Sequence, residues 1–224
     1  MNDIVKIENR EIDGFDSVSD DGDEQRLIQG HRVSFTNDAT WVIGDDEELP
    51  RGREFTVVNL GRLTQKWGKS DGPPIETRIL GPEEKFPDVK ALNEATPKSE
   101  WREGPNGLQG PWANVHIVYM VDLDNAERFT FPTSTVGGSI AVGDLKKSTV
   151  WMRRFRGQHV YPVVKLRDIY MSTRFGGRQR PHFEVVRWIA LGGENEAGEM
   201  AKLTGPREVE EPTAKEVTND QIPF

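Results

Sequence analysis

The order of strand-like and helix-like segments in the second half of the chain constrains the fold more than any other feature. Residues 112–121, 128–133, 160–171 and 183–191 are rich in Val, Ile, Tyr and Phe, which is typical of strands. Residues 139–155 instead repeat their apolar side chains with helical spacing. The second half therefore predicts two strands, one helix and two further strands.

The predicted helix has clear end signals. Ser139 is expected to cap its N-terminus, and Gly157 is expected to end it after a last turn rich in arginine. Its buried face is expected to carry Ala141, Leu145, Ser148, Met152 and Phe155. The tryptophans in apolar surroundings are expected in the core, and they are Trp41, Trp151 and Trp188.

Strand signals also occur in the first half, at residues 31–35, 40–43 and 53–63. Between residues 68 and 111, seven prolines alternate with glycines, which predicts a long irregular insertion with one short helix near Val89–Ala95. Trp101 and Trp112 border this insertion and either stack on bases or pin it to the rest of the protein.

An OB-fold has the same element order: about three strands, a helix, and two more strands that close a small barrel. The sequence therefore predicts a mainly β protein, with an OB-like barrel, one amphipathic helix, the Gly/Pro-rich insertion and disordered acidic tails. We expect an acidic N-terminal segment at residues 1–28, an OB-like domain at 29–191 with its insertion at about 68–111, and an acidic tail at 192–224. Other small mixed or all-β folds share the order.

The net charge of −8 conceals a strong asymmetry along the chain. Residues 145–188 carry eleven Lys and Arg against two acids, Asp168 and Glu184, and sum to +9, whereas residues 1–54 sum to −9 and residues 189–224 to −5. Such a compact basic block is typical of a phosphate-binding surface, and a merely solvated basic face is the alternative.

Several classes of protein are excluded by composition. The chain has no cysteine, which excludes disulfides, thiolate metal sites and cysteine nucleophiles. No run of 18 apolar residues is present, and the N-terminal residues lack the apolar stretch of a secretory signal. We therefore expect a cytoplasmic protein without a membrane partner.

The last six residues are Asn219-Asp220-Gln221-Ile222-Pro223-Phe224, at the end of an acidic segment. This ending resembles the C-terminal tip of bacterial single-stranded-DNA-binding proteins, although Asn219 and Gln221 stand where acids are common in that family. The preceding tail also lacks the family's usual Gly/Gln/Pro-rich linker, which favours a phage or plasmid-borne relative.

In that family the tip docks on replication, recombination and repair proteins. The resemblance therefore implies that the tip of this chain docks on such partners through four residues, Asp220, Ile222, Pro223 and Phe224.

Binding of single strands requires cations for the phosphates and exposed aromatic rings for the bases. Both residue types are interleaved after the second strand block and along the last predicted hairpin, whose turn reads RFGGRQR. The candidate DNA-binding residues are Arg62, Lys66, Trp67, Lys69, Lys165, Arg167, Tyr170, Arg174, Phe175, Arg178 and Arg180.

Enzyme motifs are incomplete. Gly138–Gly143 has the spacing of a phosphate-binding loop, but Asp144 stands in place of its lysine. Asp122-x-Asp124-Asn125 lacks the Gly and Glu of a calcium loop and is typical of a turn. The four histidines are dispersed. We therefore expect no catalytic residue, no metal and no cofactor.

The sequence thus predicts a non-enzymatic protein that coats single-stranded DNA and recruits partner enzymes. A β-rich adaptor that uses the same tip without binding DNA, and a phage metal-dependent nuclease, are the alternatives. A homo-oligomer is left open.

Overall fold

The computed structural model describes residues 27–69, 72–104, 107–173 and 176–190. The predicted acidic tail at 192–224, and the predicted N-terminal segment apart from residues 27 and 28, lie outside these ranges, so the expected domain limits and the disorder of the tails stay predictions. Among the described residues, no helix combines the length and apolarity needed to cross a membrane.

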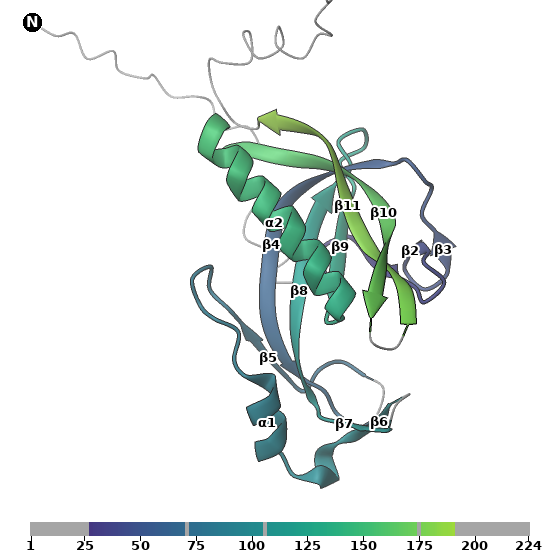
Figure 1. Cartoon of the computed structure of the whole chain (residues 1–224), viewed down its shortest axis with the longest axis vertical. Coiled ribbons are helices and arrows are strands. Elements are labelled where there is room, and N and C mark those ends of the chain that lie inside the picture. Colours follow the sequence, from purple (N-terminus) through teal and green to yellow (C-terminus); the bar gives the residue numbers. More distant parts are fainter. Residues whose placement is uncertain (1–26, 70–71, 105–106, 174–175, 191–224) are drawn as a thin grey trace, which may run out of the picture. The chain divides into compact units, whose positions relative to one another are not determined.

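The described residues form eleven strands, two α-helices and one short 3-10 helix (Figure 1). In chain order the elements are β1 (His31–Phe35), β2 (Trp41–Ile43), β3 (Glu47–Glu48), β4 (Glu54–Lys66), β5 (Glu76–Ile79), α1 (Val89–Ala95), η2 (Lys98–Glu100), β6 (Arg102–Gly104), β7 (Gly107–Gln109), β8 (Trp112–Val121), β9 (Arg128–Thr133), α2 (Val136–Arg156), β10 (Val160–Thr173) and β11 (Gly176–Ala190).

Nine of these strands form one curled sheet in the order β11-β10-β4-β8-β9-β1-β2-β3, with β5 added alongside the end of β4. The long strand β4 joins the two halves, because it pairs with β10 through Glu54–Thr56 and with β8 along most of its length. Figure 1 shows the sheet curling into a half-barrel with α2 along it. The prediction of a mainly β protein is confirmed.

The curl brings the two ends of the strand order together through side chains. Trp41 of β2 donates a hydrogen bond from Nε1 to the carbonyl oxygen of Arg167 on β10, at 2.9 Å. Its ring centroid lies 4.9 Å from that of Phe131 and 5.9 Å from that of Phe183. A buried tryptophan therefore links β2 to β10 and β11, and its predicted place in the core is confirmed.

The core lies inside the curl and against α2. Phe55, Val118, Met120 and Phe129 are almost fully buried. Their strand neighbours Thr56, Ile117 and Thr130 are also almost fully buried, so parts of β4, β8 and β9 are covered on both faces of the sheet. Leu145 of α2 belongs to the same cluster, so the helix and the sheet share one core.

The insertion is more ordered than the sequence predicted. It contains β5 to β7, η2 and α1, and α1 has the predicted limits. Thr96 accepts hydrogen bonds from both bordering tryptophans: Trp101 Nε1 donates to its carbonyl oxygen at 3.1 Å, and Trp112 Nε1 to its Oγ1 at 3.2 Å. Because Trp112 belongs to β8, it pins the insertion to the sheet as one of the two alternatives expected, whereas the bond of Trp101 lies within the insertion.

The N-terminus of α2 differs from the prediction. The helix starts at Val136, and Thr135 caps it by accepting a hydrogen bond from the Gly138 N–H at 3.0 Å; Ser139 lies inside the helix. The predicted start was too late because the glycines concealed the first turn. A Cβ atom at Gly138 would collide with Thr133, so a tight approach selects glycine there. The predicted end at Gly157 is confirmed.

The predicted buried face of α2 is wrong in its second half. The fully buried residues of α2 end at Leu145, Ser148 is exposed, and Met152 is half-buried. Phe155 is 69% exposed, and Trp151, expected in the core, is 59% exposed. The helix extends beyond the core that it covers, so the apolar side chains of its second half lie on a face exposed to solvent.

Candidate nucleic-acid interface

The last hairpin extends beyond the rest of the sheet. β10 pairs with β4 only through Val163–Lys165, whereas it pairs with β11 as far as Thr173 and Gly176. The strands are longer than the predicted 160–171 and 183–191, so Arg178 and Arg180 lie in β11 and not in a turn. We call residues 169–173 and 176–180, which form the outer part of this hairpin, the finger.

The finger presents different side chains on its two faces. Opposed residues of an antiparallel pair share a face. Ile169 opposes Arg180 and Met171 opposes Arg178, whereas Tyr170 opposes Gln179 on the other face. Arg178 is exposed and, among the described residues, has no acidic partner. One face thus combines cationic with apolar groups, and the other carries an aromatic ring.

Tyr170 is 65% exposed and yet held in place. Its ring lies so close to Gly177 that a Cβ atom at that position would collide with it. One side of the ring therefore packs on the strand, and the remainder faces solvent. A ring that is ordered before binding loses less entropy when it stacks on a base. The sequence marked Tyr170 as a candidate but did not show that Gly177 positions it.

Three predicted cations of the hairpin are already paired with acids. Lys165 Nζ lies 3.4 Å from Glu54 Oε1, Arg167 Nε donates to Glu184 Oε2 at 2.9 Å, and Arg180 Nη2 donates to Asp144 Oδ2 at 3.2 Å. The first two pairs are partly exposed, so a phosphate can replace the carboxylate at little cost. Arg180 is mostly buried and instead ties the finger to α2.

The acids of these exposed pairs have lowered pKa values. The hydrogen bond from Arg187 is the main cause that lowers the pKa of Glu54, with Lys165 adding to it. The hydrogen bond from Arg167 lowers the pKa of Glu184. A phosphate therefore competes with charged carboxylates for these cations at neutral pH.

The other group of predicted DNA-binding residues, Arg62, Lys66, Trp67 and Lys69, lies next to the insertion. Arg62 donates from Nη2 to the carbonyl oxygens of Gly81 and Pro82, and Lys66 Nζ lies 2.7 Å from Glu100 Oε2. The Arg102 guanidinium carbon lies 5.7 Å from the centroid of the Trp67 ring, whereas Lys69 is exposed.

This second group is not joined to the finger. Lys165 lies opposite Glu54, and Arg62 follows eight residues later, about 26 Å along β4. The structure therefore does not gather the two predicted groups into one site.

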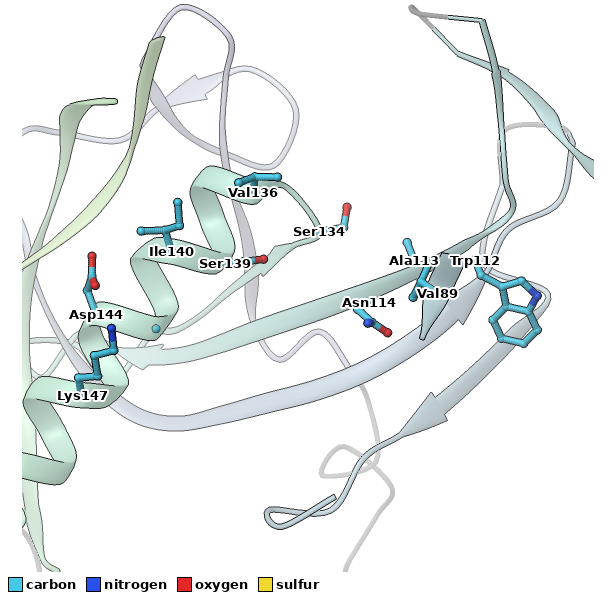
Figure 2. A pocket seen from close by; sticks show the side chains of 11 residues that line it. Val89, Trp112, Ala113, Asn114, Ser134, Val136, Ser139, Ile140, Asp144 and Lys147 are labelled. Atoms are coloured by element: carbon cyan, nitrogen blue, oxygen red, sulfur yellow. The ribbon is translucent and has the colours of Figure 1, made fainter. Parts of the chain in front are cut away.

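A groove that the sequence did not indicate lies between α2, the start of β8 and α1. It has a volume of about 710 Å³ and is open to solvent. Figure 2 shows Ile140, Asp144 and Lys147 of α2 across from Trp112 and Asn114 of β8.

The second half of α2 carries an exposed aromatic pair. The ring centroids of Trp151 and Phe155 lie 5.1 Å apart with an edge-on geometry. The Arg154 guanidinium carbon lies 5.9 Å from the Trp151 ring centroid. The sequence signal was present, since Trp and Phe stand four residues apart among Arg153, Arg154 and Arg156, but the helical spacing led to their assignment to the core.

The Asp122 segment forms a turn. Asp122 Oδ2 accepts a hydrogen bond from Arg53 Nε at 2.7 Å, and its Oδ1 accepts one from the Asp124 N–H at 2.9 Å. Within the part of the chain that the structure describes, no group of three His, Asp or Glu residues is placed to hold a metal ion.

Six of the predicted site residues lie outside the described residues: Arg174, Phe175, Asp220, Ile222, Pro223 and Phe224. No protein-family model, no curated protein and no solved structure matches the chain. Any function must therefore be argued from the chain's own residues.

Proposed function

We propose that the protein binds single-stranded DNA through an OB-like body and recruits replication, recombination or repair proteins through its C-terminal tip. The observation that carries the proposal is the finger, where an exposed, pre-oriented Tyr170 and an exposed Arg178 project from the end of a curled sheet. Within the described part of the chain, Arg178 has no acidic partner. The proposal assigns the protein no catalytic activity.

The strand order supports an OB-like body. In such a barrel the first long strand is shared by the two halves and the helix separates the third and fourth strands. Here β4 is the shared strand, β8 and β9 follow it, and α2 precedes β10 and β11. The finger then corresponds to the connection between the last two strands, one of the loops with which OB-folds hold oligonucleotides. The structure departs from such a barrel at the point of closure, where β9 pairs in parallel with β1. Trp41 of β2 there reaches β10 through its hydrogen bond to the Arg167 carbonyl oxygen.

The chemistry of the finger suits a single strand with little sequence preference. Every base has a face that can stack on a tyrosine ring, and every nucleotide has a phosphate that can meet a guanidinium. Duplex DNA hides its base faces, so only the cations of the finger remain useful to it. The finger therefore favours unpaired over paired strands.

Tyr170→Ala is expected to weaken the binding of a fluorescently labelled oligo-dT at least fivefold, because a base–aromatic stack contributes about 1–3 kcal/mol. The wild-type protein is expected to bind this oligonucleotide more tightly than a duplex of equal length, and more weakly as salt is raised. Fluorescence anisotropy at two salt concentrations measures both effects.

Gly177→Ala is the matched variant, since its new methyl group displaces the Tyr170 ring and leaves the charge of the finger unchanged. It is expected to weaken binding in the same direction while preserving the melting temperature. Equal affinity of the wild type for duplex and single strand, or a complete lack of binding, contradicts the proposal. If the tip still captures partners in the latter case, the protein is an adaptor.

Phe224→Ala tests the tip. The change keeps the charge of the tail and removes the terminal ring, a stiff apolar anchor next to Pro223. It is expected to abolish the capture of a replication or repair enzyme in a pull-down and to leave the affinity for oligo-dT within twofold. A lower melting temperature with unchanged capture is the opposite outcome, and it would make the tip part of the fold.

A further inference from the structure

One face of α2 unites the exposed rings, the groove and the link to the finger. At 100° per residue, five side chains fall within an arc of about 80° whose centre lies about 120° around the helix from Leu145. We call this set the outer stripe, and its members are Ile140, Asp144, Lys147, Trp151 and Phe155. Its first three residues line the groove of Figure 2, and its last two are the exposed aromatic pair.

The exposed rings of Trp151 and Phe155 indicate a surface that binds another molecule. Trp151 and Phe155 lie side by side and are 59% and 69% exposed. Exposed apolar side chains that cluster in this way are typical of interaction surfaces, whereas isolated ones need no explanation. The described residues leave most of both rings open to solvent.

The charge of the second half of α2 indicates what kind of molecule binds there. From Lys146 to Arg156 it carries five cations and no acid. Two copies of such a surface repel each other, which disfavours a symmetric contact between copies of the chain. The partial negative charge at the C-terminus of the helix reduces this positive charge but does not cancel it. A polyanion with flat apolar groups matches both the cations and the rings.

The acid within the stripe is already neutralised by the finger. Asp144 Oδ2 accepts the hydrogen bond from Arg180 Nη2, so its charge does not oppose a phosphate. The same bond places the stripe beside β11. From Asp144 to Phe155 the stripe runs for about 16 Å at 1.5 Å per residue. A polyanion held on the finger can therefore continue along α2.

We infer that the outer stripe of α2 is a second contact surface for single-stranded DNA, in which Trp151 and Phe155 stack on bases and Lys147 contacts a phosphate. Arg154, whose guanidinium lies beside the Trp151 ring, contacts a further phosphate. The inference rests on the proposed function. It assigns the helix a direct role in binding, in addition to its packing on the sheet.

The test combines affinity with a local optical signal. Trp151→Ala and Phe155→Ala are each expected to weaken binding of labelled oligo-dT by about fivefold or more. Trp151→Phe keeps a ring that stacks, so its affinity is expected to stay within threefold of wild type. It removes the indole, so the quenching of tryptophan fluorescence by unlabelled oligo-dT is expected to fall. Val150→Ala, an exposed apolar change outside the stripe, is the matched control and is expected to bind normally.

Two results overturn the inference while the proposed function stands. In the first, the wild type binds oligo-dT, yet both alanine variants bind as tightly and Trp151→Phe keeps the full quenching. In the second, the alanine variants lower the sedimentation coefficient at unchanged affinity, which makes the stripe a contact between copies. If the wild type itself does not bind oligo-dT, the proposed function fails, and the inference fails with it. Circular dichroism and the melting temperature verify that each variant is folded.

Discussion

Trp41→Ala is expected to lower the free energy of unfolding by about 3–5 kcal/mol, the usual cost of truncating a buried Trp or Phe. Trp41 is 6% exposed and fills the space between β2 and the last hairpin, where it contacts Phe131 and Phe183. The truncation also leaves the carbonyl oxygen of Arg167 without its indole donor. Urea denaturation followed by circular dichroism measures the loss.

Two further variants separate the causes of this loss. Trp41→Phe keeps an aromatic ring but removes the indole N–H, so it is expected to cost less than Trp41→Ala. Trp151→Ala makes the same chemical change at an exposed position and is expected to cost under about 1 kcal/mol. If Trp41→Ala and Trp151→Ala destabilise the protein equally, then Trp41 does not link the two ends of the sheet.

Arg53→Met is expected to have the second largest effect and to lower the free energy of unfolding by about 2–3 kcal/mol. Arg53 donates to Asp122 at 2.7 Å, and Asp122 is largely buried. The guanidinium carbon also lies 4.8 Å from the ring centroid of Phe129. Removing the cation leaves a buried carboxylate with fewer donors, and that desolvated charge is the main cost. Denaturation in urea at pH 7 measures it.

The effect of Arg53→Met is expected to depend on pH. Burial alone raises the pKa of Asp122, but the hydrogen bonds from the Asp124 N–H and from Arg53 outweigh it, so the pKa is lowered on folding. A carboxyl group with a lowered pKa contributes stability above its unfolded pKa of about 3.9 and loses that contribution as the pH falls through the folded value.

The difference between wild type and Arg53→Met is therefore expected to be constant near neutrality and to shrink below about pH 4. Asp122→Asn is the control, because it retains an acceptor for the Asp124 N–H but cannot titrate. A difference that grows on acidification would contradict this account of the Arg53–Asp122 pair.

Local patterns predicted the strands well where the residue types are typical of strands. β1, β8 and β9 have the predicted limits because they are rich in β-branched and aromatic residues. The outer ends of β10 and β11 lie outside the core and carry Gly, Arg and Ser. Local composition there is typical of a turn, and only the pairing between the two strands makes them extended.

The candidate site was less predictable because the role of each residue depends on which side chains of other elements contact it. Arg180 and Arg178 are equivalent in the sequence, two residues apart on one strand, but Asp144 on another element pairs with only one of them. Trp151 and Phe155 have the spacing of a core face, and their exposure depends on where the sheet beneath α2 ends. Tyr170 owes its orientation to Gly177, which only the register of the hairpin brings next to it.

The parallel pairing of β1 with β9 has a consequence for synthesis on the ribosome. Gln29 and Thr130 are 101 residues apart, yet the Gln29 N–H donates to Thr130 Oγ1 at 2.9 Å, and Thr130 Oγ1 donates to the Gln29 carbonyl oxygen at 2.7 Å. At about 5–20 residues per second, β1 emerges about 5–20 s before β9, its parallel neighbour in the sheet, has been made. Trp41 lacks its core neighbour Phe183 for longer still, because Phe183 is synthesised after β9. The apolar side chains of β1 and β2 are thus more exposed to chaperones, proteases and aggregation in the nascent chain than in the finished protein.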